Sequence, residues 1–425
     1  MVFILFSQLK SKDRETHSTH PERSTMNLLL ITNLFPPQEL GGYGRAMEDF
    51  AWGLEQRGHS ITILTSDAPY LENDCNGITH TSIVIIRDLQ LKGSWSEDGI
   101  TYCINQSVLK TIDSKNIAVI EKTMNRQEFD GVILGNIDLL GHEILPPLLD
   151  AGIPLRHHCG FVAPPFESKH CPKDCNYQLV AASKAVLNSL LENGLPVQNA
   201  QVIYPGARCD LFGSDLLQRS LPAPLGLSLT PNNKSLGSIS NPLRICFAGL
   251  IIASKGVHTL AEAIIILRER GVHTYTSFAG KPFQAGYQEA IEKLLAYNKL
   301  MDQVSFVGQL KREQLARFYL LNHVAIFPSI YPEAFGIVAA EAMASGLILV
   351  SSGAGGASEL FEDGISGLSF QPGNPQSLAD VLQQFVLWPS NRIKAMALAG
   401  QNRVRESFSV LNAAEKFEKL FRCCD

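Results

Sequence analysis

The sequence predicts an α/β protein made of two parallel-sheet domains of similar size. The chain has 425 residues, which at about 100–200 residues per domain suggests two or three domains. Short apolar runs alternate with segments of helical periodicity on both sides of a central stretch, residues 213–241, which is rich in Ser, Pro, Leu and Asn. Since alternating strands and helices build parallel sheets, we expect one sheet flanked by helices on each side of that linker.

The N-terminal domain is expected over residues 26–212. The apolar run LLLIT at 28–32 predicts a buried strand, and the glycine-rich loop NLFPPQELGGYG follows it. Residues 45–57 have helical periodicity and end at Gly58, before a second strand at 60–66. This order of strand, loop, helix and strand implies a parallel pair. Further strands are expected at 83–87, 131–135, 153–157, 178–182 and 201–203.

The same alternation restarts after the linker, so the C-terminal domain is expected over residues 242–425. Strands are expected at 243–250, 273–280, 304–308, 323–329 and 347–352. Helices are expected at 256–270, 285–299, 312–321, 336–345, 375–387 and 392–422, the last of which would close this domain. Because ligands of such sheets bind outside the carboxyl ends of the strands, a site is expected in the cleft between the domains.

Residues 1–25 do not follow the strand and helix pattern. Val2–Phe6 is apolar, but no basic segment precedes it and a polar stretch follows, which makes a poor signal peptide. We expect a disordered leader, or a true start at Met26.

Cysteine usage and hydropathy indicate a cytoplasmic protein. The nine cysteines are an odd number, whereas a disulfide framework normally has an even count in a short secreted chain. No apolar run approaches the roughly 20 residues that a membrane span requires. Cys171 and Cys175 form one C-x3-C pair without a second pair at ligand spacing, so no metal site is expected.

The charge balance bears on the binding partners. The net charge is −5, which disfavours a protein that coats nucleic acid. Residues 26–212 carry 13 basic and 21 acidic side chains, whereas residues 241–425 carry 17 and 16. An anionic ligand should therefore bind the second domain through local amides and a lysine, and not through a broad positive electrostatic potential. The acidic N-terminal domain gives no electrostatic support to membrane contact, so any contact with an inner membrane face would be weak and peripheral.

The stretch FPSIYPEAFGIVAAEAMASG, residues 327–346, has the richest chemistry. It leaves a strand, turns through two prolines and enters a helix at about Gly336. The free N–H groups of that helix start would make an anion site. Glu333 precedes these amides and Glu341 lies eight positions further on. Taken alone, Glu341 could be a helix-surface carboxylate and Glu333 a charge that complements the helix dipole.

In its whole context the stretch resembles the E-x7-E signature of retaining glycosyltransferases of family 4, the group 1 enzymes that resemble glycogen synthases and mannosyltransferases. Three more segments are similar to that family: PPQELGGYGRAMEDFAWGLEQRGHSITILT, the pair LVAASKAV and VIYPGARCDLF, and FAGLIIASKGVHTLAEA. The resemblance covers most of residues 26–422. It implies the GT-B architecture, in which two Rossmann-like domains face each other across a cleft.

The resemblance also implies roles for matching residues. Glu333 would contact the hydroxyls of the donor sugar, Glu341 would bind the ribose, and Lys255 would contact the diphosphate. The whole donor-binding set that it implies is Gly42, Lys255, Phe335, Gly336, Ile337, Val338 and Glu341. The chemistry agrees, since phosphates need amides and a cation, a ribose diol suits a carboxylate, and close backbone approach needs glycine.

At two positions this sequence departs from the family's pattern. The usual arginine after Gly249 is Leu250 here, so that Arg45, Arg208 or Lys281 would have to supply the missing cation.

The second departure concerns the family's active-site histidine. Its expected position is held by Gly160, while His157 and His158 lie two or three residues earlier. We favour His158 as the equivalent catalytic residue, beside Glu333 and Lys255. The alternative for either histidine is a structural residue at a strand end.

The resulting hypothesis is a retaining, metal-independent glycosyltransferase that uses a UDP- or GDP-linked sugar and no further cofactor. Its acceptor would be a glycan, a lipid-linked saccharide or a small molecule, as in cell-envelope or exopolysaccharide biosynthesis. No D-x-D stands at a strand end to hold a divalent metal. Two alternatives stay open: a GT-B phosphorylase or epimerase, and a GT-B-like binding or scaffold protein, for which Leu250 is the best support.

Overall fold

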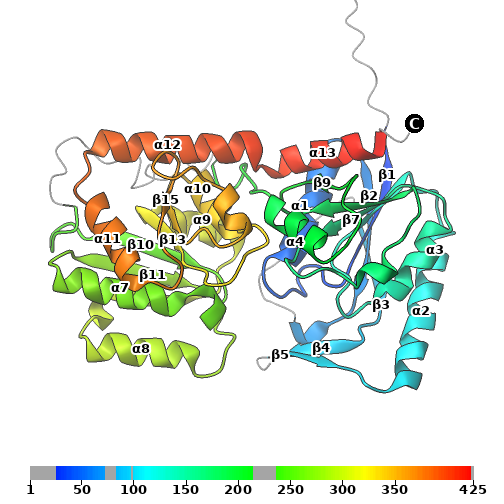
Figure 1. Ribbon diagram of the computed structural model, residues 1–425, viewed down its shortest axis with the longest axis horizontal. Coiled ribbons are helices and arrows are strands. Elements are labelled where there is room, and N and C mark those ends of the chain that lie inside the picture. Colours follow the sequence, from blue (N-terminus) through cyan, green and yellow to red (C-terminus); the bar gives the residue numbers. More distant parts are fainter. Residues whose placement is uncertain (1–24, 72–82, 97–98, 214–235, 423–425) are drawn as a thin grey trace, which may run out of the picture.

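Two parallel β-sheets, one in each half of the chain, form the frame of the protein in this computed structural model (Figure 1). The structure describes residues 25–71, 83–96, 99–213 and 236–422. Residues 1–24 of the expected leader and most of the expected linker therefore lie outside the described residues. The two predicted parallel α/β domains are confirmed, and we call them the N-terminal and C-terminal lobes.

The N-terminal lobe contains a seven-stranded sheet in the order β3-β2-β1-β6-β7-β8-β9, and all its strand pairs are parallel. The strands are β1 (Asn27–Thr32), β2 (Ser60–Ser66), β3 (Val84–Leu89), β6 (Gly131–Leu134), β7 (Leu155–Cys159), β8 (Tyr177–Ala181) and β9 (Gln201–Val202). The helices are α1 (Tyr43–Gln56), α2 (Gln106–Met124), α3 (Leu145–Leu149) and α4 (Lys184–Glu192). An antiparallel hairpin of β4 (Gly93–Ser96) and β5 (Gly99–Tyr102) stands apart from this sheet.

The C-terminal lobe contains a six-stranded parallel sheet in the order β12-β11-β10-β13-β14-β15. The strands are β10 (Leu243–Ala248), β11 (Thr274–Ala279), β12 (Val304–Gly308), β13 (Val324–Phe327), β14 (Ile348–Ser351) and β15 (Leu368–Ser369). The helices are α7 (Val257–Glu269), α8 (Tyr287–Tyr297), α9 (Arg312–Leu320), α10 (Ile337–Ala344), α11 (Pro375–Phe385) and α12 (Ser390–Ser407).

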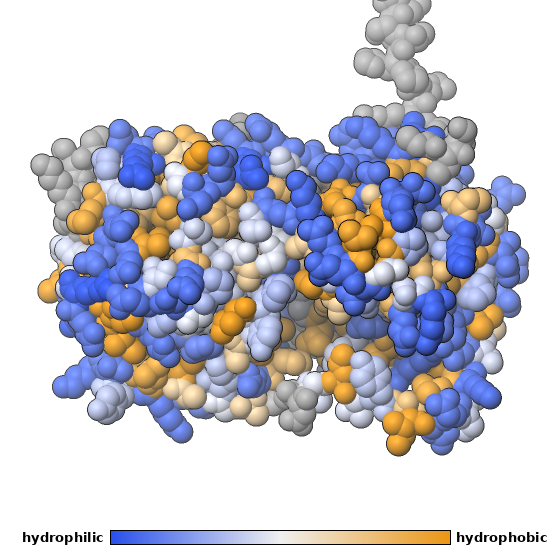
Figure 2. Space-filling model, in the orientation of Figure 1, coloured by the Kyte–Doolittle hydropathy of each residue, from blue (hydrophilic) through white to orange (hydrophobic). Residues whose placement is uncertain are grey.

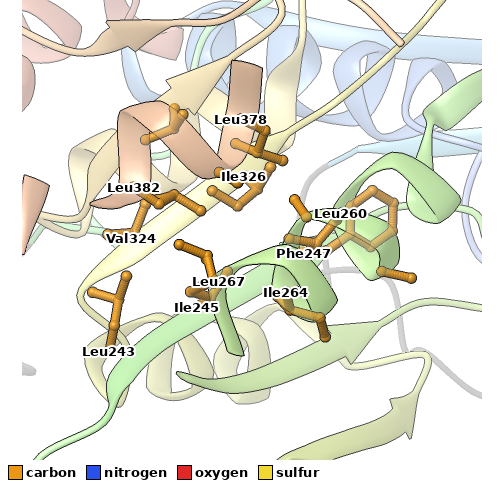
Figure 3. Packing of buried hydrophobic residues seen from close by; sticks show 14 of the residues in the cluster. Leu243, Ile245, Phe247, Leu260, Ile264, Leu267, Val324, Ile326, Leu378 and Leu382 are labelled. Carbon is orange, nitrogen blue, oxygen red and sulfur yellow. The ribbon is translucent and has the colours of Figure 1, made fainter. Parts of the chain in front are cut away.

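Burial on both faces explains why the central strands of this sheet read as continuous apolar runs. In β10, Ile245 and Phe247 belong to the cluster on one face and Cys246 to the cluster on the other. Figure 3 shows the first cluster, in which leucines and isoleucines of α7 and α11 pack over β10 and β13. The α7 contribution is spaced as an amphipathic helix requires, at Leu260, Ile264 and Leu267.

The C-terminal end of the chain differs from the prediction of one helix over 392–422. It forms α12 and then α13 (Val410–Arg422), with a break at residues 408–409. The break is stabilised by Ala207, whose N–H donates to the Phe408 carbonyl at 2.7 Å while its own carbonyl accepts from Val410 N–H at 3.1 Å. The two helices cross from one lobe to the other (Figure 1).

Helix α13 packs on the N-terminal lobe, although the sequence placed it with the C-terminal domain. Phe417 is fully buried in the same cluster as Phe50 of α1, with ring centroids 5.0 Å apart. After the C-terminal lobe is complete, the last helix of the chain therefore packs on the N-terminal lobe. The crossing helices thus connect the two lobes in addition to the linker.

Candidate active site

The candidate site lies where the loop after β1 meets the turn after β13. Each segment leaves the carboxyl end of its own sheet and enters a helix, α1 in one lobe and α10 in the other. A Cβ atom placed on Gly42 would lie 3.5 Å from Cδ1 of Ile337, so the two helix starts are in direct reach. Figure 2 shows the surface hollowed between the two lobes.

Lys255 and Glu333 form a close ion pair on the C-terminal side of the site. Lys255 Nζ lies 2.6 Å from Oε1 and 2.8 Å from Oε2 of Glu333. The Ser329 hydroxyl also donates to Oε1 of this carboxylate. The two side chains keep 29% and 16% of their exposure, so both remain accessible from the cleft. The structure thus brings together two of the residues that the sequence predicts as catalytic.

Backbone contacts fix both members of this pair. Lys255 ends the short 3-10 helix η4 (Ala253–Lys255), and Gly256 follows with a positive φ of 66°. A Cβ atom on Gly256 would lie 2.0 Å from the Pro328 carbonyl oxygen, so only glycine fits. Glu333 is held from the other side, since its N–H donates to the Ala354 carbonyl at 3.1 Å.

The start of α10 presents backbone N–H groups to the cleft. Its N-cap residue Gly336 has φ +113°, and no side chain of the described residues caps the helix. The first N–H groups of an α-helix have no intrahelical partner, which leaves those of Ile337 and Val338 for an anion. Phe335 contributes no side chain here, because its ring is buried against Phe408 with centroids 5.7 Å apart.

Glu341 lies one turn further along α10 and is almost fully buried. Its Oε1 accepts from Nη2 of Arg45 in the other lobe at 3.0 Å, and its Oε2 has no hydrogen-bond partner among the described residues. Burial raises the pKa of Glu341, while the charges of Arg45 and Arg312 act to lower it. A buried carboxylate oxygen without a partner is costly, which suggests that a ligand donor completes it.

A second pair of charges joins the same two lobes. Arg312, the first residue of α9, binds Asp49 of α1 in bidentate fashion, with distances of 2.5 and 2.9 Å. Both side chains are largely buried, at 11% and 2% exposure. Burial disfavours the charged guanidinium, but the charge and hydrogen bonds of Asp49 more than offset this and raise the pKa of Arg312. Helix α1 is therefore bound to the C-terminal lobe at two points along one face.

His158 lies in the core of the N-terminal lobe and not at the cleft surface. Its Nε2 is 2.9 Å from the Ile203 carbonyl and its Nδ1 is 2.9 Å from the Tyr43 hydroxyl. Burial lowers its pKa to about 4. His157 is equally buried, with Nδ1 2.7 Å from the Tyr177 hydroxyl. Both histidines are thus buried and hydrogen-bonded within the lobe, which is the arrangement expected for the structural alternative, and the catalytic role of His158 stays a prediction.

Tyr43 occupies the space beside Gly160, the position at which the resemblance implied a histidine. A Cβ atom on Gly160 would lie 1.6 Å from the Tyr43 ring, far inside any real contact. The Tyr43 hydroxyl donates to the His158 carbonyl at 2.6 Å, so the ring is fixed in this place. The glycine at 160 and the tyrosine at 43 are therefore a complementary pair.

The three cations considered as substitutes at Leu250 have different surroundings. Arg208 is engaged, with Nη2 2.6 Å from Asp210 and its guanidinium 3.4 Å from the Trp52 ring centroid. Arg45 pairs with Glu341, as described above. Lys281 is exposed.

The sequence reasoning missed four polar residues at this site. They are Ser329, which supports Glu333, and Glu39, Asp49 and Arg312 in the contact between the lobes. Burial raises the pKa of Glu39 to about 7, partly offset by the charge of Arg45. Asp49 follows Arg45 by four positions, a spacing that places both on one helix face. The spacing does not show which residue of the other lobe would contact Arg45 or Asp49.

Two further findings concern metals and membranes. The described residues contain no group of three or more His, Cys, Asp or Glu that could hold a metal ion. Within that same part of the chain, no helix has the length and apolar character needed to cross a membrane.

The chain is similar to known glycosyltransferases. Residues 230–403 match the family described as Glycosyl transferases group 1. A D-inositol 3-phosphate glycosyltransferase of Streptomyces griseus is 32% identical over 211 residues, which are 47% of this chain and 44% of the relative. An uncharacterized glycosyltransferase of Methanocaldococcus jannaschii is 24% identical over 362 residues, 83% of this chain and 87% of the relative. The chain thus spans about half the length of the first of these relatives.

Solved structures show the same architecture. HepE of Anabaena, solved in complex with UDP and glucose, superposes with a TM-score of 0.66 at 18% identity, over 94% of this chain and 100% of HepE. At that identity the likeness concerns the fold, and it confirms the predicted pair of facing Rossmann-like domains. Taken together, these findings assign the chain the GT-B fold, and residues 230–403 are the segment that is similar to the group 1 glycosyltransferases.

Proposed function

We propose that the protein is a retaining glycosyltransferase that moves a sugar from a UDP- or GDP-linked donor to an acceptor. The observation that carries this proposal is the set of groups collected on the C-terminal side of the cleft. The ion pair of Lys255 and Glu333, the free amides at the start of α10 and the unpartnered oxygen of Glu341 lie within one connected stretch of structure. Gly42 faces them from the other lobe.

Each group matches one part of a nucleotide-diphosphate sugar. The α10 amides and Lys255 would stabilise the negative charge that develops on the leaving diphosphate. Glu341 would accept hydrogen bonds from the ribose hydroxyls at its unpartnered Oε2. Glu333 would accept from the hydroxyls of the sugar, held in place by Lys255 and Ser329. The UDP and glucose in the HepE complex favour UDP as the first nucleotide to test.

Retention and metal independence are the finer parts of the proposal. They are supported by the resemblance of the E-x7-E stretch to retaining enzymes, and by the positive groups already present where the diphosphate would lie. Proton NMR of the product's anomeric position should show the configuration of the donor. An inverted product, or a strict requirement for a divalent metal, would contradict this part of the proposal.

We propose that the acceptor is a glycan, a small molecule or a lipid-linked saccharide of cell-envelope or exopolysaccharide biosynthesis, which approaches from the N-terminal lobe at the cytoplasmic side. The β4–β5 hairpin and the residues after it expose apolar side chains in that lobe. Tyr102 is 61% exposed and Ile104 is 89% exposed. Such side chains favour weak contact with a lipid-linked acceptor.

Binding measurements test the proposal before the acceptor is known. Thermal unfolding would be followed with UDP-, GDP-, ADP- and TDP-sugars, for the wild type and for Lys255→Ala and Glu341→Gln. We expect a rise in melting temperature with one nucleotide class, reduced in both variants, because ligand that binds only the folded state stabilises it. An unchanged melting temperature with every nucleotide sugar would contradict the proposal.

A second candidate is a binding or scaffold protein with weak or no catalysis, and Leu250 is the observation that favours it. Leucine cannot donate a hydrogen bond to a phosphate. In that case the nucleotide sugar would still bind, but NMR would show no consumption of the donor, either by transfer or by slow hydrolysis.

A further inference from the structure

We propose that Arg45 is a positioning residue for ribose recognition, which orients the carboxylate of Glu341 from the opposite lobe. The nucleotide site is then complete only when the two lobes meet. This inference rests on the proposed function, which assigns the ribose to Glu341.

The first support is the unequal use of the two carboxylate oxygens. Oε1 of Glu341 accepts from Arg45 at 3.0 Å, whereas Oε2 is buried without a hydrogen-bond partner among the described residues. An ionised carboxylate accepts hydrogen bonds at both oxygens. Arg45 thus orients the carboxylate through one oxygen and leaves the other for a hydroxyl of the ligand.

The second support is electrostatic. Glu341 is 1% exposed, and burial favours its neutral form, in which one oxygen becomes a hydrogen-bond donor. The positive charge of Arg45 opposes this effect of burial by lowering the pKa of Glu341, and it does so more than Arg312. The negative charge of Asp49 raises the same pKa. Hydrogen bonds to a charged acceptor are about twice as strong as those to a neutral one. Removing the guanidinium should therefore weaken recognition of the ribose in particular.

The third support is that α1 already holds Arg45 in place. Asp49 lies one turn after Arg45 on the same helix face and is bound by Arg312 at 2.5 and 2.9 Å. Because this second pair fixes α1, Arg45 lies beside Glu341 before any ligand binds. The N-terminal lobe therefore contributes to the nucleotide site as well as to the acceptor side.

The test is the selectivity for ribose over deoxyribose. Calorimetric titrations would compare UDP with 2′-deoxy-UDP, and GDP with 2′-deoxy-GDP, on the full chain. In the wild type the preferred ribonucleotide should bind about tenfold or more tightly than its deoxy analogue, as a charged hydrogen bond implies. In Arg45→Met the ribonucleotide should lose most of this advantage, while affinity for the deoxy analogue, which keeps only the 3′-hydroxyl, should fall less. Arg45→Lys should restore part of the selectivity.

Matched controls separate this role from a general effect on the fold. Arg57→Met removes the arginine that caps the C-terminal end of α1, which has nearly the same exposure as Arg45 and pairs with Glu418 of α13. It should keep wild-type selectivity. In a Glu341→Gln background, Arg45→Met should cause no further loss, because the two residues act as one unit. If Arg45→Met does not fold, Arg45→Gln, which keeps a donor without the charge, should show the same loss of selectivity.

The outcomes distinguish this inference from the proposed function. A wild type that binds neither UDP nor GDP overturns the proposed function and the inference with it. A wild type that prefers the ribonucleotide, with a preference unchanged in the folded Arg45 variants, overturns the role of Arg45 alone.

Discussion

At the scale of single residues, the candidate site contains two charged pairs, and Oε2 of Glu341 has no hydrogen-bond partner among the described residues. Lys255 engages both oxygens of Glu333, whereas Arg45 engages only one oxygen of Glu341. The sequence predicted Lys255, Glu333 and Glu341 as site residues, because they lie in stretches with recognisable chemistry. It did not predict the pairing of Arg45 with Glu341, since a contact across 296 positions depends on how the lobes meet.

Lys255→Ala should weaken binding of the preferred nucleotide diphosphate by about 1.5–3 kcal/mol, the range for hydrogen bonds to charged groups. The loss arises because the variant removes the cation beside the α10 amides. Isothermal titration calorimetry would measure it. Lys293→Ala, which removes an exposed lysine of α8, serves as the control and should bind as the wild type. Equal affinity of the two variants would contradict the role of Lys255.

Leu250→Arg should tighten donor binding or raise kcat/KM by about tenfold or more, the equivalent of one charged hydrogen bond. The sequence favoured a substitute cation at this point. In the structure, however, Arg208 is bound to Asp210 and stacked on Trp52, and Arg45 is bound to Glu341.

The alternative is that Lys281 already supplies the contact. Lys281→Ala would then lower activity, and Leu250→Arg would give no gain. Steady-state kinetics of the two single variants and the double variant distinguish these cases.

At the scale of helices and strands, the sequence predicted the buried parallel strands and the helices between them in the C-terminal lobe. The strands read as continuous apolar runs, and the buried residues of a helix such as α7 recur at helical spacing. Helix α2 and the β4–β5 hairpin were not predicted. Only three residues of α2 are buried, Asn116, Ile120 and Thr123, so that its sequence has little apolar pattern to detect.

The break between α12 and α13 was also missed, for a different reason. The sequence from 392 to 422 is helical in composition throughout, and no proline or glycine marks residues 408–409. The interruption comes from Ala207, which lies about 200 positions earlier and pairs with the backbone on both sides of the break. A contact of that kind is a property of the tertiary structure.

Gly160→Ala should destabilise the protein by about 1–3 kcal/mol, the usual cost of overpacking. The reason is that the new Cβ would meet the Tyr43 ring at 1.6 Å. Thermal and urea unfolding would measure the loss. The double variant Tyr43→Ala/Gly160→Ala should destabilise less than the sum of the two single changes, because the first removes the clash. Strictly additive effects would contradict the pairing of these two residues.

At the scale of the whole molecule, two lobes share one site because α1 is bound to the C-terminal lobe. The sequence predicted the two domains and a cleft between them. It assigned every C-terminal helix to the second domain, whereas α13 packs on α1 of the first. Helix α1 therefore lies between α13 on one side and the charged residues of the other lobe on the other.

Arg312→Met should lower stability by about 3–5 kcal/mol, the cost of breaking a buried ion pair, because Asp49 would keep a buried charge without its bidentate partner. The matched control is Arg317→Met, which changes an exposed arginine of the same helix. Thermal unfolding should show a clear loss for the first variant and little change for the second. If both variants unfold like the wild type, the pair of Arg312 and Asp49 does not bind the lobes together.

The central claim is that a nucleotide-diphosphate sugar binds between the lobes with its parts on assigned groups. The most direct measurement is a crystal structure of the protein with the nucleoside diphosphate that stabilises it most. We expect the phosphates at the Ile337 and Val338 amides and Lys255, and the ribose hydroxyls at Oε2 of Glu341, with Arg45 still on Oε1. A nucleotide bound elsewhere, or a ribose that makes no contact with Glu341, would contradict the account.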